Sequence, residues 1–176
     1  MSLAAGATLG SLALLSFSIP GQGGQTVEWT QALTPANTGV PGDTVQTIHL
    51  DANDDPWIAG FITFWEQGGM AHWDGTEWTG VTNVDHPVIE SPRFTDIVED
   101  ASGVLWIGTD RGLLRYDPAI GPTSLTLQNE TNSPLVNAKI SGLDLAPDGT
   151  LWIGSNDWNV SPPGSLARFD PADGTW

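Results

Sequence analysis

One segment with a central tryptophan occurs three times in this chain of 176 residues. The copies read ANDDPWIAG, DASGVLWIGT and PDGTLWIGS, and they occupy 52–60, 100–109 and 147–155. Aligned on Trp57, Trp106 and Trp152, they stand 49 and then 46 residues apart. A period of this length is typical of propeller blades and other repeat arrays, so we expect a chain built from repeated units.

Each copy belongs to a longer unit that predicts four short strands. The first strand is apolar, at 45–50, 94–99 and 140–145, and the second carries the tryptophan. The third strand ends in an aromatic residue and an aspartate, within 69–75, 112–118 and 165–171. TVEWT at 26–30 matches GTEWT at 75–79, which places the fourth strand there and adds an outer strand near the N-terminus.

Small and polar residues mark the turns and close contacts of each unit. The first turn contains residues that accept the positive φ of a tight hairpin: Asn53-Asp54, Ser102-Gly103 and Asp148-Gly149. A small residue follows each tryptophan by two positions, at Ala59, Gly108 and Gly154, and its missing side chain would let a neighbouring backbone approach.

Four-stranded antiparallel units repeated about an axis are the blades of a β-propeller. We therefore predict an all-β fold, an incomplete propeller over 25–176, with about three blades and the outer strand 26–30. The blades are expected at 44–82, 93–128 and 139–176. Because propellers have about four to eight blades, further blades are expected from a longer chain or from another chain. The break within a strand at 173–176 favours a longer chain, and a β-solenoid is the alternative fold.

Charge and the N-terminus limit the partners and the compartment. The formal charge of -16 would repel a polyanion, so nucleic acid is not expected as a partner. The chain has no cysteine, which excludes disulfides and thiolate metal sites. Residues 1–24 carry a short apolar run before a Pro-Gly break, typical of a signal peptide, and they predict a periplasmic, extracellular or cell-surface protein.

The repeat resembles a known family. The pattern of an apolar strand, D-x-x-G, LWIGT and GLxRYDP is similar to the two-component-regulator propeller repeat. That repeat occurs in the periplasmic sensor portions of hybrid bacterial two-component systems and in many secreted or surface proteins. The resemblance implies a propeller fold and a sensory or interaction role, with a signalling or surface protein as partner.

The repeated tryptophans are expected to pack between adjacent blades, because a ligand site would not need the same residue in every unit. Asp51, Asn53 and Asp55 have the alternate spacing that begins an EF-hand loop. The loop lacks the glycine at its sixth position, which is Pro56, and the glutamate at its twelfth, which is Ile62. A hairpin turn explains these residues, so no metal site and no cofactor are expected.

Departures from the repeat indicate where a ligand could bind. The connections after the second strand are enlarged at 60–69 and 155–164, and each holds a tryptophan outside the repeat. Aromatic rings beside polar groups suit stacking on a sugar or another flat ligand. The predicted ligand-binding residues are Trp65, Glu66, Arg111, Asn156, Asp157 and Trp158, with Arg111 as the cation for a carboxylate. The alternative is that each insertion covers its own hydrophobic surface.

These features predict an exported ligand-recognition, sensory or interaction module without catalytic residues, and a saccharide or other small molecule as ligand. A structural scaffold for a surface or an assembly is the main alternative. A metal-dependent propeller lyase, using His86 and Glu90, is a third hypothesis.

Overall fold

The computed structural model describes residues 17–20, 26–29, 44–61, 67–156 and 164–176. The chain divides into two units, residues 1–33 and 34–176. In the first unit, β1 (Phe17–Pro20) pairs antiparallel with β2 (Thr26–Trp29). The predicted outer strand is therefore β2, and its partner is β1; that it completes a blade stays a prediction. Across the described residues, the structure has no helix with the length and apolar character that a membrane crossing requires.

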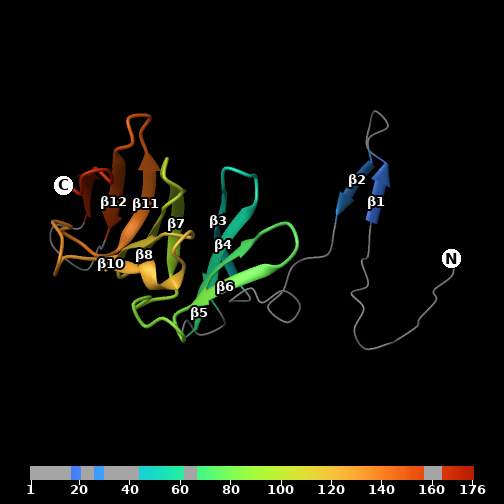
Figure 1. The fold of residues 1–176 in the computed structure, drawn as a ribbon, viewed down its shortest axis with the longest axis horizontal. Helices are drawn as coiled ribbons and strands as arrows, with labels where there is room; N and C mark the ends of the chain where they lie inside the picture. The colour runs from blue at the N-terminus through green and yellow to red at the C-terminus, as the bar shows by residue number, and fades with distance from the viewer. Residues whose placement is uncertain (1–16, 21–25, 30–43, 62–66, 157–163) are drawn as a thin grey trace. The chain divides into compact units, whose positions relative to one another are not determined.

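The second unit consists of three antiparallel sheets (Figure 1). The first sheet contains β3 (Thr44–Leu50), β4 (Pro56–Phe61), β5 (Gly68–Trp73) and β6 (Trp78–Thr82). The second contains β7 (Phe94–Glu99), β8 (Leu105–Thr109), β9 (Gly112–Tyr116) and β10 (Thr126–Gln128), with the 3-10 helix η1 (Pro122–Ser124) before β10. The third contains β11 (Ile140–Leu145), β12 (Leu151–Asn156) and β13 (Gly164–Phe169).

Each sheet is a meander whose first strand lies at one edge. The first strand of the second sheet, β7, contacts both β3 and β11, so the three sheets meet along their first strands. Figure 1 shows β7 between these two strands. This is the arrangement of neighbouring propeller blades around an axis, and the predicted all-β propeller fold is confirmed.

The fourth strand of the first sheet differs from its prediction. It begins at Trp78, whereas the pattern placed it at 75–79. Gly75 has a φ of 88°, and the Asp74 carboxylate accepts hydrogen bonds from the backbone N–H groups of Thr76 and Glu77, both at 2.8 Å. These contacts hold a turn over the first half of the predicted strand. In the third sheet, the described residues after β13 form a single β-bridge, between Asp170 and Thr175, in place of a fourth strand.

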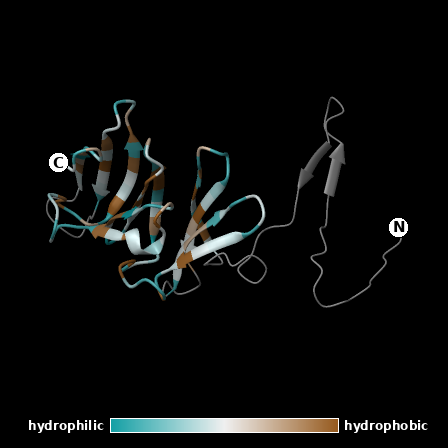
Figure 2. Cartoon of the chain, in the orientation of Figure 1, coloured by the Kyte–Doolittle hydropathy of each residue, from teal (hydrophilic) through white to brown (hydrophobic). Residues whose placement is uncertain are grey.

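The core lies between the sheets. We call the side of each sheet that carries Trp57, Trp106 or Trp152 its tryptophan face, and the side that carries Ile58, Ile107 or Ile153 its isoleucine face. One apolar cluster joins the tryptophan face of the first sheet to the isoleucine face of the second, and another joins the second sheet to the third in the same way. The alternation of hydrophobic and hydrophilic residues that gives each strand an apolar side is visible along β11 and β12 (Figure 2).

The prediction for the repeated tryptophans is correct for two of the three. Trp57 and Trp106 are 5% and 3% exposed, and their rings contact the next sheet at Tyr116 (5.7 Å) and Phe169 (5.1 Å). Trp152 is 40% exposed, so its predicted burial is wrong for this chain. The physical reason is that no described sheet packs on the tryptophan face of the third sheet.

The turn predictions are confirmed, and one packing prediction is changed. Asp54, Gly103 and Gly149 have φ values of 65°, 78° and 87°. A Cβ on Gly108 would lie 2.5 Å from Thr95 Oγ1 and 2.8 Å from Ile140 Cγ2. The space at Gly108 is therefore taken by neighbouring side chains, including one from the next sheet, and not by a backbone as predicted.

Candidate functional site

The turns after β3, β7 and β11 lie at one end of their sheets, and two of them share one design. The Asp51 carboxylate accepts hydrogen bonds from the backbone N–H groups of Asn53 (2.8 Å) and Asp55 (3.1 Å). Asp100 does the same for Ser102 (2.8 Å) and Val104 (3.2 Å). A short acceptor side chain that satisfies its own turn in this way is a common hairpin device.

These contacts also explain the electrostatics of Asp51. Partial burial raises the pKa of this carboxyl, because it disfavours the charged form. The N–H groups of Asn53 and Asp55, together with His72, favour the carboxylate and outweigh burial, so the net pKa lies below 3.8. Asp51 is therefore ionised at neutral pH.

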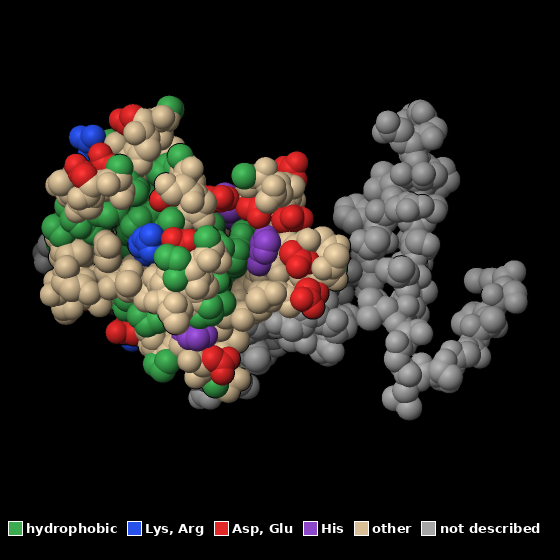
Figure 3. All heavy atoms as spheres, viewed as in Figure 1, with side chains coloured by type: hydrophobic (Ala, Val, Ile, Leu, Met, Phe, Trp, Pro, Cys, Tyr) green, Lys and Arg blue, Asp and Glu red, His purple; other side chains and the backbone are tan. Residues whose placement is uncertain are grey.

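A cavity of about 750 Å³ opens among the three turns. Small apolar residues from all three sheets line it, including Ala52, Ala101 and Pro147. Its lining includes the imidazole of His49 and the carboxyl groups of Asp51, Glu99 and Asp100, and the lining that the structure describes includes no lysine or arginine. Figure 3 shows histidine and acidic side chains side by side over the first and second sheets. We call this the turn cavity.

Two histidines connect the acidic groups around the turn cavity. His49 Nε2 lies 3.4 Å from Glu99 Oε2, which joins the ends of β3 and β7. His72 Nε2 lies 3.0 Å from Asp51 Oδ2, and the His72 ring stacks on Trp57 with centroids 4.4 Å apart. Both histidines are partly exposed, and at least one member of each pair lines the turn cavity.

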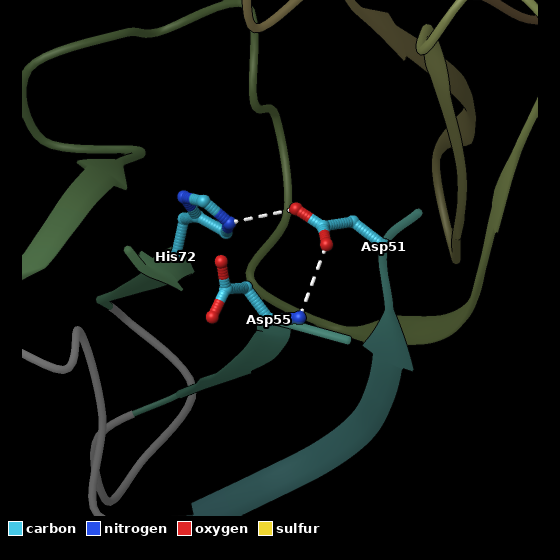
Figure 4. Close-up of side chains that lie close together, drawn as sticks. All are labelled: Asp51, Asp55 and His72. Atoms are coloured by element: carbon cyan, nitrogen blue, oxygen red, sulfur yellow. Dashed lines mark hydrogen bonds and ion pairs between the residues drawn. The ribbon is translucent and has the colours of Figure 1, made fainter. Parts of the chain in front are cut away.

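Asp51, Asp55 and His72 form the group of described residues that could hold a metal ion (Figure 4). One ligand atom from each lies within 4.8 Å of the other two. Hydrogen bonds to Asp51 hold the group in place: Asp51 Oδ1 accepts from the backbone N–H groups of Asn53 and Asp55, and Asp51 Oδ2 contacts His72. Asn53 takes part through its backbone N–H. This geometry is the hairpin turn that the sequence favoured over an EF-hand.

Four of the predicted ligand-binding residues lie outside the described residues: Trp65, Glu66, Asp157 and Trp158. The other two, Arg111 and Asn156, are exposed at the β8–β9 and β12–β13 connections. The backbone N–H of Arg111 donates to Thr109 Oγ1 at 3.0 Å. These connections follow the second strand of each sheet, whereas the turn cavity lies where that strand begins, so the cavity contains neither Arg111 nor Asn156.

The described residues place no third potential ligand beside His86 and Glu90, the pair of the alternative metal-dependent lyase hypothesis. Within the described ranges, neither residue belongs to a group of three potential metal ligands. His86 instead stands in a tight loop, where its backbone N–H donates to the Thr82 carbonyl at 3.0 Å.

Sequence reasoning missed the pair of His49 and Glu99. The signal was present as a departure from the repeat, because Glu99 stands where the other copies have Leu50 and Leu145. A charged residue at an apolar strand position needs a partner, and the partner comes from the neighbouring sheet. Aligning the repeats did not show which residue of the neighbouring sheet would face Glu99.

Residues 89–111 match the family described as Two component regulator propeller. The match spans β7, β8 and the tryptophan segment between 100 and 109. Residues 89–111 therefore carry a two component regulator propeller repeat. The resemblance inferred from the sequence is thereby confirmed for the second of the three units.

Three solved structures match this chain over 84 to 85% of its length. The extracellular domain assigned to a hybrid two component system of B. thetaiotaomicron has a TM-score of 0.62 at 16% identity, with 85% of this chain and 18% of that chain covered. PorZ, a surface component of the type-IX secretion system of Porphyromonas gingivalis, has a TM-score of 0.48 at 16% identity, covering 84% and 23%. The extracellular domain assigned to a one component system of B. thetaiotaomicron has a TM-score of 0.35 at 15% identity, covering 84% and 24%.

The first of these structures shares the propeller fold with this chain. The chain spans 18 to 24% of the lengths of the three structures. No curated protein matches it.

Proposed function

We propose that this chain is part of an exported β-propeller that recognises a small ligand in the turn cavity and performs no catalysis itself. The observation that carries the proposal is that turns from three sheets converge on one cavity of about 750 Å³, a volume typical of ligand sites. A site built from several blades is suited to reporting a ligand, because binding changes the contacts between sheets. A signalling or surface protein would receive that signal.

An exported location supports a sensory role. The apolar run in residues 1–24 is typical of a signal peptide. The structure with the TM-score of 0.62 is an extracellular domain. We therefore place the propeller in the periplasm, outside the cell or on the cell surface.

The lining favours a neutral or amine-bearing saccharide. Asp51, Glu99 and Asp100 are hydrogen-bond acceptors, so they suit a ligand with hydroxyl or ammonium donors. An anionic ligand would meet these carboxylates and a chain of formal charge -16, which also argues against nucleic acid. Small lining residues such as Ala101 and Gly103 leave room for a sugar ring.

Binding to an array of neutral, amino and acidic sugars, followed by calorimetry, tests this proposal. Ala101→Trp fills the cavity from an exposed turn position and should abolish binding of a neutral or amino sugar. Ala119→Trp, at an exposed position in another turn, is the matched control and should bind like the unmodified chain.

A second pair of variants separates the turn cavity from the site predicted by sequence. If Trp65→Ala with Trp158→Ala removes binding while Ala101→Trp retains it, the enlarged connections are the site. Acidic sugar binding that is lost in Arg111→Ala would point the same way. Binding of no sugar or other small ligand would favour the structural scaffold, and metal-dependent turnover of a substrate would overturn the non-catalytic proposal.

A further inference from the structure

Asp55 departs from the repeat at a position that is buried in the other two units. The aligned residues are Val104 and Thr150, which are 6% and 3% exposed. Asp55 is partly buried, and its hydrogen bonds with Asp51 use its backbone N–H and carbonyl. Among the described residues, its carboxylate has no hydrogen-bond or ion-pair partner. A carboxylate that replaces a buried side chain is stabilised when a cation lies beside it.

His72 is a second departure in the same sheet. The aligned residues of the other units are Arg115 and Arg168. The His72 ring stacks on Trp57, with centroids 4.4 Å apart and an interplanar angle of 22°, and this contact orients the ring. Its Nε2 lies 3.0 Å from Asp51 Oδ2. The imidazole is therefore held with one nitrogen toward a carboxylate.

The hairpin of the second sheet provides an internal comparison. Asp100 is aligned with Asp51 and holds its own turn in the same way, but its second oxygen accepts a hydrogen bond from Trp106 Nε1 at 2.9 Å. An indole N–H is a donor only, whereas an imidazole nitrogen can also be a metal ligand. The two hairpins therefore share a backbone design and differ in the chemistry beside it.

We propose that Asp51, Asp55 and His72 bind one divalent transition-metal ion such as Zn²⁺. One ligand atom from each residue lies within 4.8 Å of the other two (Figure 4). Carboxylate oxygen and imidazole nitrogen are both ligands of Zn²⁺, whereas Ca²⁺ takes oxygen ligands. The ion would replace the proton between His72 Nε2 and Asp51 Oδ2, and that proton would move to Nδ1 or to solvent. Three protein ligands leave one position of a four-coordinate ion for water or another ligand.

The surroundings favour a cation at this place. Asp51 also lines the turn cavity, so the ion would lie beside it. A formal charge of -16 attracts cations to the chain as a whole. His72 stands 21 residues after Asp51, on another strand, so the comparison of the turn with an EF-hand did not reveal this set of ligands. The site goes beyond the proposed function, because metal binding needs no sugar.

The experiment is calorimetric titration of the chain with Zn²⁺ after treatment with a chelator. The expected result is one ion per chain. Co²⁺ is then used in place of Zn²⁺, because its visible absorption band reports the ligands around the ion. Both measurements are made without sugar, so a failure of sugar binding would not alter them.

Two pairs of variants test the ligands. Asp55→Asn and His72→Gln should each weaken Zn²⁺ binding by at least about tenfold and change the Co²⁺ band. Asp54→Asn is the matched control for charge, since it removes one carboxylate from the same turn and asparagine accepts the φ of 65° found there. His86→Gln is the control for loss of an imidazole. Both controls should bind like the unmodified chain, and circular dichroism checks the fold of all four variants.

Three results would overturn the proposal. The first is a chain that binds no Zn²⁺. The second is equal weakening by Asp55→Asn and Asp54→Asn, because it would mean that the ion only follows the negative charge of the turn. The third is a loss of binding in His49→Gln that is absent in His72→Gln, because the ion would then lie between His49 and the carboxylates of the turn cavity. If His72→Gln does not fold, the comparison of Asp55→Asn with Asp54→Asn still decides.

Discussion

At the scale of single residues, the same position performs different tasks in different repeats. Asp51 and Asp100 each serve two N–H groups of their own turn with one carboxylate oxygen. The second oxygen of Asp100 accepts a hydrogen bond from Trp106 Nε1 at 2.9 Å, whereas that of Asp51 contacts His72. The oxygen that accepts from the turn N–H groups stabilises the hairpin in both sheets. The other oxygen has a different partner in the first sheet than in the second. Candidate functional chemistry therefore lies in the departures from the repeat.

The repeated tryptophans give a matched test of burial. Trp106→Ala should lower the free energy of unfolding by about 3–5 kcal/mol, because it empties a packed site between two sheets. Trp152→Ala removes a ring that is 40% exposed and should cost clearly less. Denaturant titrations compare the free energies of unfolding of the two variants. Equal losses would contradict the assignment of Trp106 to the core.

Asp74 predicts a defined dependence of stability on pH. Hydrogen bonds from the Glu77 backbone, then from the Thr76 side chain and backbone, lower the pKa of Asp74 from 3.8 to about 2. Because the folded pKa is depressed, the carboxylate stabilises the fold above the unfolded value, and this stabilisation is lost as pH falls toward 2.

Asp74→Asn keeps the acceptor oxygen and removes the charge, so it should be less stable than the unmodified chain at neutral pH. The difference in Tm should shrink as pH falls from 4 to 2. Melting curves at stepwise pH measure it. A difference that stays constant across this window would show that the ionised form of Asp74 contributes nothing.

At the scale of elements, all three first strands carry an irregularity at the same place. The register shifts between Val45 and Thr47 in β3, and at the aligned positions of β7 and β11. Such bulges increase the local twist of a strand and redirect its side chains. Here the strands that carry them are those by which neighbouring sheets meet. The bulge is therefore a repeated element of the blade and not a local accident.

Gly108 and Gly154 test how closely the sheets pack. Gly108→Ala places a Cβ 2.5 Å from Thr95 Oγ1 and 2.8 Å from Ile140 Cγ2, and both neighbours have stiff, β-branched side chains. The expected loss of stability is about 1–3 kcal/mol, as for other overpacked sites.

Gly154→Ala is the matched control for this prediction. Its Cβ would lie 3.3 Å from Ser141 Oγ, which needs only a small adjustment. Thermal melts should therefore show a smaller change than in Gly108→Ala. If both variants melt alike, the close contact at Gly108 can be relieved without cost, and the argument from Ile140 fails.

At the scale of the whole second unit, burial is a property of the stack of sheets. The second sheet is covered on both sides, and its Ile107, Leu113 and Leu114 are fully buried. The first and third sheets are covered on one side each and expose Ile48 and Leu166 on the other. The turn cavity is likewise shared among sheets, since no single unit supplies its walls. Ligand binding in the turn cavity, as proposed, would therefore depend on neighbouring units.

The sequence by itself determined the repeat, the turns after the first strands and the first three strands of each sheet, because strand alternation and turn chemistry are encoded within a few residues. Only the tertiary structure decided that Trp152 is exposed while Trp106 is buried, and that His49 meets Glu99 across two sheets. Those outcomes depend on which sheet lies opposite a side chain. A repeat of the same residues cannot specify that, since identical segments acquire different neighbours along the stack.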